Sequence, residues 1–242
     1  IKLTLQGYAG ANYITPLVFM IVLGTVLLNA ATARIVARIT GVLLKKSEGI
    51  LIVGSSEPSR LIAKYLKDND RRVVLIDSNK SNISRAKLEG LEAIECDIYE
   101  NDLLENIELN DMGYLLALTG SNTINEYALN KFKADFGEEG AFRLISSEEM
   151  RDSKNNPEQG LFSHTDDFIN ISEVVRDYPM INEVEVKSRE HFEELIDATH
   201  KEIKAIPLFL KDLKDEIHIL PADSSKMEVG PGYKMMYLGK KI

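Results

Sequence analysis

The chain has 242 residues, enough for one large domain or two of modest size, and its composition is that of an ordinary globular protein. Its single cysteine, Cys96, excludes an internal disulfide and a cysteine-based zinc site. The net charge of −9 is unevenly divided, because residues 1–48 carry +4 and the remainder carries −13. A body this acidic is not expected to bind nucleic acid.

An uncharged segment near the N-terminus predicts a membrane-spanning helix. No charge occurs between Lys2 and Arg34, and the stretch 14–33 is almost wholly apolar. At about 1.5 Å per residue this stretch spans roughly 30 Å, the thickness of the hydrocarbon in a bilayer. Pro16 suits the first turn of such a helix. We therefore expect a transmembrane helix at about residues 14–34 and a linker up to residue 48.

The residues around this segment predict its orientation and its surroundings. The basic residues that follow it are Arg34, Arg38, Lys45 and Lys46. The positive-inside rule then puts the later residues in the cytoplasm. Small and weakly polar residues such as Gly24 and Thr25 are typical of contacts between membrane helices. Because the chain begins with Ile1 rather than Met, we expect the last helix of a longer membrane protein.

Two other interpretations of the apolar segment stay open. It resembles a signal peptide in that Ala31-Thr32-Ala33 imitates a cleavage site, although the basic residues lie on the wrong side. It also resembles the buried core helix of a soluble protein, although so long an uncharged run is hard to bury in a domain of this size.

From residue 49 onward, short apolar runs alternate with segments of helical spacing. Strands are expected at 49–54, 72–77, 93–96, 113–119 and 141–146. Helices are expected at 60–67, 79–89, 102–107 and 122–136. Regular alternation of this kind predicts an α/β fold, namely a Rossmann-like doubly wound parallel sheet over residues 49–150.

The first turn of such a sheet usually carries three glycines and binds a pyrophosphate. Here Gly54 is the first, and Ser56 and Ser59 stand where the other two would be. Serine is small and donates a hydrogen bond, so this turn, which includes Ser55, remains a candidate phosphate site. Asp77 lies 23 residues after Gly54, close to the spacing of an acid that holds ribose hydroxyls.

Two alternatives are left open at this turn. In the first, the fold is retained for packing and assembly alone, and its nucleotide site has decayed. Arg60 is a candidate phosphate contact, and an exposed helix arginine is the plainer interpretation of it.

A short motif lies at the end of each of the first four expected strands. These motifs are Gly54, Asp77, Cys96-Asp97 and Ala117-Leu118-Thr119-Gly120-Ser121-Asn122. Together they resemble the TrkA-N, or RCK, family, the cytoplasmic regulatory domains of bacterial potassium channels and cation transporters. The third motif of that family is Gly-Asp, with its acid near the adenine, and Cys96 replaces this glycine here. The resemblance implies that Asp97 and Thr119 also contact a nucleotide, that the ligand is NAD(H) or an adenine nucleotide, and that the chain forms a homodimer.

The apolar segment sharpens this resemblance. Residues 16–34 look like the final transmembrane helix of sodium/proton antiporters of the cation:proton antiporter-1 type, some of which carry a TrkA-N-like domain directly after it. The resemblance implies a bacterial inner-membrane protein whose remaining helices precede Ile1. Nothing from Leu17 to Ala33 is ionisable, so the ion path is expected outside this chain.

The C-terminal residues 151–242 are expected to form a small α+β subdomain, similar in its ending to those that follow RCK domains. Helices are expected at 165–178, capped by Thr165, and at 189–201, capped by Ser188. Strands are expected at 183–187, 203–210, 216–220 and 233–238. The exposed face of the second helix is expected to carry Glu193, Glu194 and Asp197.

The sequence predicts neither a metal site nor an enzyme. Its four histidines, His164, His191, His200 and His218, have no metal-ligand spacing, and no nucleophile is evidently paired with a base. The leading hypothesis is therefore a nucleotide-sensing regulatory domain of a membrane antiporter. A ligand-free dimerisation module of a transporter or channel is the alternative, and an NAD-dependent oxidoreductase ranks last because the glycine fingerprint is incomplete.

Overall fold

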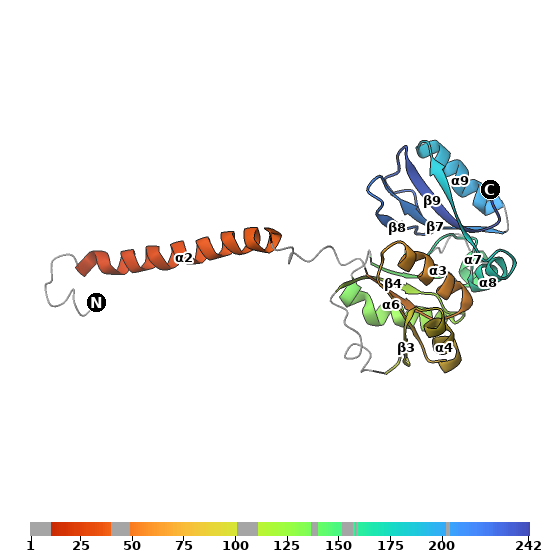
Figure 1. The fold of residues 1–242 in the computed structure, drawn as a ribbon, viewed down its shortest axis with the longest axis horizontal. Helices are drawn as coiled ribbons and strands as arrows, with labels where there is room; N and C mark the ends of the chain where they lie inside the picture. The colour runs from red at the N-terminus through yellow and green to blue at the C-terminus, as the bar shows by residue number, and fades with distance from the viewer. Residues whose placement is uncertain are drawn as a thin grey trace. The chain divides into compact units, whose positions relative to one another are not determined.

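The computed structural model describes residues 11–39, 49–100, 111–136, 140–151, 157, 159–201 and 204–242. By their internal contacts the residues form two compact units, Ile1–Lys45 and Lys46–Ile242 (Figure 1). The expected linker after residue 39 and the expected helix 102–107 lie outside the described residues.

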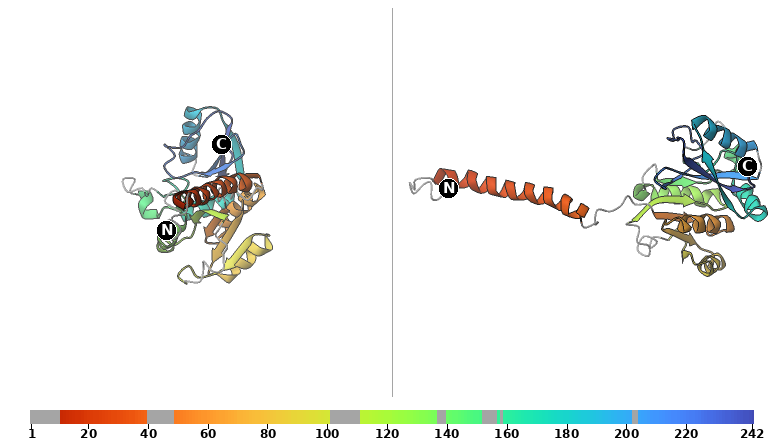
Figure 2. Two further views of the ribbon diagram at one scale, coloured as in Figure 1. Left: turned by 90° about the vertical axis from the view of Figure 1, so that its left-hand side faces the viewer. Right: turned by 45° about the horizontal axis from the view of Figure 1, so that its top comes forward.

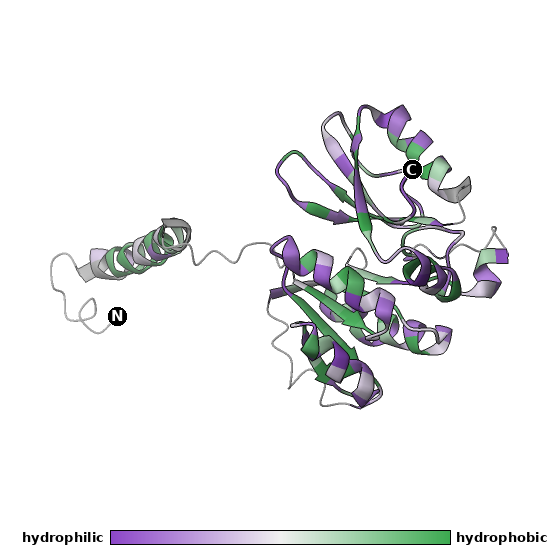
Figure 3. Ribbon diagram, turned by 45° about the vertical axis from the view of Figure 1, so that its right-hand side comes forward, coloured by the Kyte–Doolittle hydropathy of each residue, from purple (hydrophilic) through white to green (hydrophobic). Residues whose placement is uncertain are grey.

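The first unit contains one long helix, α2 (Ala11–Ile39). Its segment Pro16–Ala33 is long and apolar enough to cross a membrane, and none of that segment is buried. The hydroxyls of Thr25 and Thr32 donate to the carbonyls of Val22 and Leu28 at 2.9 and 2.7 Å, so these polar groups are satisfied within the helix. Figure 3 shows hydrophobic residues along much of this helix. The expectation that Pro16 lies in the first turn was wrong, because the helix begins five residues earlier.

The second unit opens with a five-stranded parallel sheet. Its strands are β1 (Gly49–Val53), β2 (Val73–Asp77), β3 (Glu92–Glu95), β4 (Met112–Ala117) and β5 (Ala141–Arg143). The spatial order is β3-β2-β1-β4-β5, so the order reverses between β1 and β4. All four pairings are parallel. The apolar runs form strands because both faces of the sheet are covered.

Helices cover the two faces of this sheet. Ile50 and Ile52 face a cluster that contains Ile62 and Ile83, from α3 (Glu57–Asp68) and α4 (Lys80–Leu88). Alternate residues of β1 face the other cluster, which includes Phe132 of α6 (Asn122–Phe136). The predicted Rossmann-like, doubly wound sheet is therefore confirmed, and Figure 2 shows helices on both of its sides.

The C-terminal residues add a second, antiparallel sheet. In the order β6-β9-β7-β8 it contains β6 (Ile181–Val186), β9 (Tyr233–Gly239), β7 (Ala205–Lys211) and β8 (Ile217–Ile219). The helices of this part are α7 (Ser147–Arg151), α8 (Phe168–Asp177) and α9 (Arg189–Lys201). One face of the sheet packs on α9, and the other joins the α3 side of the parallel sheet in one apolar cluster. The expected α+β architecture of this part is confirmed.

Two helix starts differ from expectation. Helix α8 is capped by Asp167, whose carboxylate accepts the N–H groups of Ile169 and Asn170 at 2.9 and 3.0 Å. The predicted cap Thr165 was wrong, because its hydroxyl bonds Ser163 instead. Helix α3 begins at Glu57 rather than Arg60, because Ser56 caps it and Pro58 fits its first turn.

Candidate nucleotide site

A cavity of about 300 Å³ lies at the carboxyl ends of β1 to β4, where the strand order reverses. This is the place where parallel α/β sheets bind ligands. Five of the seven predicted site residues line it, namely Gly54, Ser56, Asp77, Asp97 and Thr119. Its apolar wall is formed by Val53, Ile76, Ile98, Leu118, Ile124 and Phe168.

Gly54 is required by the geometry of the first turn. Its φ is +99°, which residues with a side chain rarely adopt. A Cβ at this position would lie 2.9 Å from Cγ2 of Thr119 and 3.0 Å from the carbonyl oxygen of Leu118. The backbone of β1 therefore turns tightly against the end of β4 and leaves the cavity open.

Asp77, at the end of β2, organises the same turn. Its Oδ2 accepts the Ser55 N–H at 2.8 Å and the Asn82 side-chain amide at 3.1 Å. Its Oδ1 accepts the Asn79 N–H at 2.7 Å. A carboxylate has about four acceptor positions, so at least one remains for a ribose hydroxyl. The carboxylate thus fits the predicted ribose contact and is held in place before any ligand arrives.

The two serines that replace glycines are bonded to each other. The hydroxyls of Ser56 and Ser59 lie 2.9 Å apart, and Ser59 also donates to the carbonyl of Leu118 at 3.4 Å. Ser59 is fully buried and lies outside the lining of the cavity, as does the buried Ser55. The structure therefore brings the predicted site residues together at the cavity, except for Ser55 and Ser59. These two residues stabilise the turn without lining the cavity.

Arg60 supports the turn as well. Its Nη1 donates to the carbonyl of Ser55 at 2.8 Å, and its Nε donates to Glu89 at 2.9 Å. The expectation of an exposed helix arginine was wrong, because only 7% of Arg60 is exposed. Its guanidinium is also not part of the cavity lining.

The wall after β3 is tied to α6. Lys131 donates to the carbonyls of Ile98 and Glu100 at 2.8 and 2.6 Å, and the rings of Tyr99 and Tyr127 lie 4.5 Å apart. Asp97 accepts the Tyr99 N–H at 3.0 Å. These contacts fix the segment that carries Asp97 beside the cavity. Next to it, burial raises the pKa of the Cys96 thiol.

Thr119 and Phe168 form another wall of the cavity. The Thr119 N–H and hydroxyl both bond Oδ1 of Asn125, at 3.0 and 2.7 Å, so this threonine is anchored to α6. Phe168, the first residue of α8, contacts Gly120, where a Cβ would lie 3.0 Å from its ring. Sequence reasoning missed Phe168, because no local pattern shows that a residue 48 positions after Gly120 returns to this cavity.

The charged side chains that line the cavity suit the adenosine part of a nucleotide better than its phosphates. Asp77 and Asp97 are the charged side chains among the described residues that line the cavity. Apolar walls and a carboxylate fit an adenine base and a ribose. Among the described residues no cation lines this part of the site to meet a phosphate, and the first turn of α3 contains Glu57 and Pro58.

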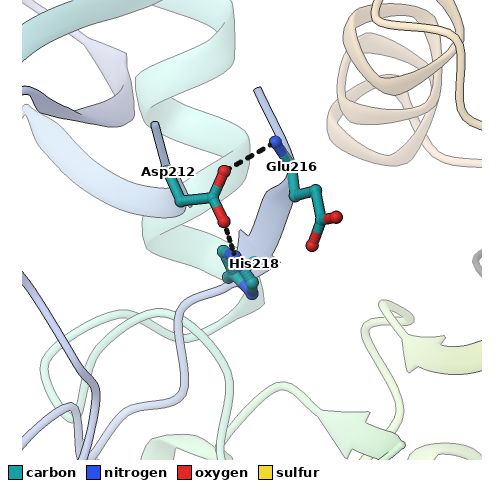
Figure 4. A group of neighbouring side chains, drawn as sticks. All are labelled: Asp212, Glu216 and His218. Carbon is teal, nitrogen blue, oxygen red and sulfur yellow. Dashed lines mark hydrogen bonds and ion pairs between the residues drawn. The ribbon is translucent and has the colours of Figure 1, made fainter. Parts of the chain in front are cut away.

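A separate cluster in the C-terminal sheet contains possible metal ligands. Ligand atoms of Asp212, Glu216 and His218 lie within 4.8 Å of one another. Asp212 accepts the backbone N–H groups of Lys214 and Glu216 at 2.8 and 2.9 Å and bonds His218 at 3.2 Å. Figure 4 shows that the backbone nitrogen of Glu216, rather than its carboxylate, is directed at Asp212. The three side chains lie close together because these hydrogen bonds stabilise the turn between β7 and β8.

One protein-family model matches the part of the chain that forms the parallel sheet. Residues 50–150, less than half of the chain, match the family model of the TrkA-N domain. The match supports a TrkA-N-type regulatory domain in this part of the chain, and together with α2 it fits a membrane protein with such a domain. No curated protein matches the chain in sequence.

Several solved structures are similar to the chain, and three of them are compared with it. The GsuK RCK domain is 11% identical over 81% of this chain and 45% of its own, with a TM-score of 0.42. The GsuK channel bound to NAD is 11% identical over 80% of this chain and 36% of its own, with a TM-score of 0.39. The TrkA-N domain of inner membrane protein ybaL from Escherichia coli is 16% identical over 44% of this chain and 93% of its own, with a TM-score of 0.32. The chain thus spans less than half the length of both GsuK structures.

Proposed function

We propose that the chain is the nucleotide-sensing cytoplasmic regulatory part of a membrane cation transporter and is not an enzyme. More specifically, we propose a sodium/proton antiporter of the bacterial inner membrane, in which α2 is the last transmembrane helix and the chain forms a homodimer. The observation that carries the proposal is the cavity at the strand-order reversal, with Asp77 at the end of β2.

The link between ligand and transport is a difference in affinity. A nucleotide shifts the equilibrium between two arrangements of the regulatory domain only if it binds one of them more tightly. The shift then reaches the membrane through the residues that join α2 to β1. The match of residues 50–150 to the TrkA-N domain supports a regulatory role of this kind.

Titration calorimetry of the full chain in detergent micelles tests the proposal. We expect AMP, ADP, ATP or NAD(H) to bind, and we expect Asp77→Asn to weaken binding about tenfold or more, because a hydrogen bond to a charged group contributes roughly 1.5–3 kcal/mol. Asp68→Asn, an exposed change at the end of α3, is the matched control and should leave the affinity unchanged. The absence of binding by every one of these nucleotides contradicts the proposal.

A ligand-free assembly module is the second candidate. The hydroxyls of Ser56 and Ser59 favour it, because they satisfy each other in the turn that would otherwise bind phosphate. A chain that dimerises in sedimentation experiments and binds none of the nucleotides would support this candidate over the first.

A further inference from the structure

The geometry points to a specificity limit at this site: it selects an adenine nucleoside or mononucleotide over a dinucleotide, and Phe168 sets that limit. The inference rests on the proposed nucleotide-sensing function and names the ligand class. It depends on the second cavity beside Phe168 and on the residues of the first turn of α3.

Phe168 lies between two cavities. The second has a volume of about 210 Å³ and is lined by residues from the ends of β4 and β5 and from α6, α7 and α8, among them Asn122, Asn125 and Ser147. Both cavities share Thr119, Gly120 and Phe168. A dinucleotide binds across the strand-order reversal, so its second half would have to pass from the first cavity into the second. The ring of Phe168 packs on Gly120 at that passage.

The position of the pyrophosphate is also unfavourable. A helix N-terminus binds phosphate through free N–H groups and its positive dipole. In α3, Pro58 has no N–H, and Ser56 accepts the N–H of Ser59. Glu57 adds a negative charge in the same turn, and Arg60 is engaged with Ser55 and Glu89. Each added phosphate therefore gains little here.

Phe168 is held in its place by its own helix start. Asp167 caps α8 and also bonds the hydroxyl of Ser147 on α7. Helix α8 packs within the apolar cluster that contains Ile171, Val174 and Phe209. This packing holds the backbone at Phe168 in place. The ring of Phe168, packed on Gly120, thus forms a boundary of the nucleotide site.

Competitive titration of the full chain in detergent micelles with adenosine, AMP and NAD tests the inference. We expect NAD to bind more weakly than AMP in the wild type. Phe168→Ala should raise the affinity for NAD relative to AMP at least tenfold, because it opens the passage. Binding of NAD as tightly as AMP, or more tightly, in the wild type overturns the inference, and so does a smaller change of the ratio in a folded Phe168→Ala chain.

A second variant keeps the test independent of the folding of Phe168→Ala. Glu57→Gln should raise the affinity for AMP at least threefold and leave adenosine unchanged, since it removes the opposing charge. Glu190→Gln, the same change in the exposed first turn of α9, is its matched control and should alter neither. An unchanged AMP affinity in Glu57→Gln counts against the inference. If adenosine, AMP and NAD all fail to bind, the proposed function fails with it, whereas a marked preference for NAD overturns the inference alone.

Discussion

Two buried charged side chains, Arg143 and Asp166, differ in the groups that surround them. Arg143 is 6% exposed and forms hydrogen bonds with Glu149 and Asn122, with Nη1 at 2.8 and 3.3 Å. The ion pair with Arg143 lowers the pKa of Glu149 to about 2. Buried charges are tolerated when they are paired in this way. Asp166 differs, because its neighbours are hydroxyls and the carboxylate of Asp167.

Asp166 predicts a pH dependence of stability. Burial raises its pKa to about 6, whereas the unfolded chain has the ordinary value of 3.8. Between these values the folded state binds the extra proton, so the free energy of unfolding should fall as the pH rises from about 4 to about 6 and should not recover above that range. Asp166→Asn should therefore stabilise the chain by about 1–3 kcal/mol at pH 8 and hardly at all at pH 4.

Urea denaturation of both chains at the two pH values measures this difference. Asp197→Asn, an exposed change on α9, is the control and should have no effect at either pH. Equal effects of Asp166→Asn at pH 4 and pH 8 would show that its carboxyl group does not titrate in this range.

At the scale of elements, the turn from β1 to α3 is the most constrained connection of the parallel sheet. Gly54→Ala should destabilise the chain by about 2 kcal/mol or more, because it combines an unfavourable φ with close contacts to Thr119 and Leu118. Gly230→Ala is the matched control, since its Cβ would have only Tyr233 nearby, at 4.0 Å. Thermal unfolding compares them, and equal melting temperatures would mean that the turn relaxes freely.

The sequence predicted elements whose cause is local. The apolar runs of β1, β2 and β4 are buried strands, and α6 has the expected bounds of residues 122–136. The start of α3 was misplaced because Pro58 marks a turn as readily as a first helical turn. The burial of Arg60 and the position of Phe168 could not be predicted, because each depends on contacts between segments distant in the sequence.

At the scale of the whole molecule, α2 predicts attachment to a membrane. Leu23→Arg combined with Leu27→Arg should release the expressed chain from the membrane fraction, since each arginine at the centre of a spanning helix costs roughly 2.5–3.5 kcal/mol. Leu88→Arg with Leu213→Arg changes two apolar residues of the second unit that are 88% and 72% exposed, and it should leave the distribution unchanged. Sedimentation after an alkaline wash measures the outcome. A wild-type chain in the soluble fraction would contradict the membrane proposal.

The order of strands has a consequence for synthesis on the ribosome. The central strand β1 ends at residue 53, and its second neighbour β4 ends at residue 117. At about 5–20 residues per second, roughly 3–13 s pass between the two during translation. During this interval one edge of β1, an apolar strand, has no partner. The nascent chain therefore passes through an aggregation-prone stage after α2 has been made and before the sheet closes.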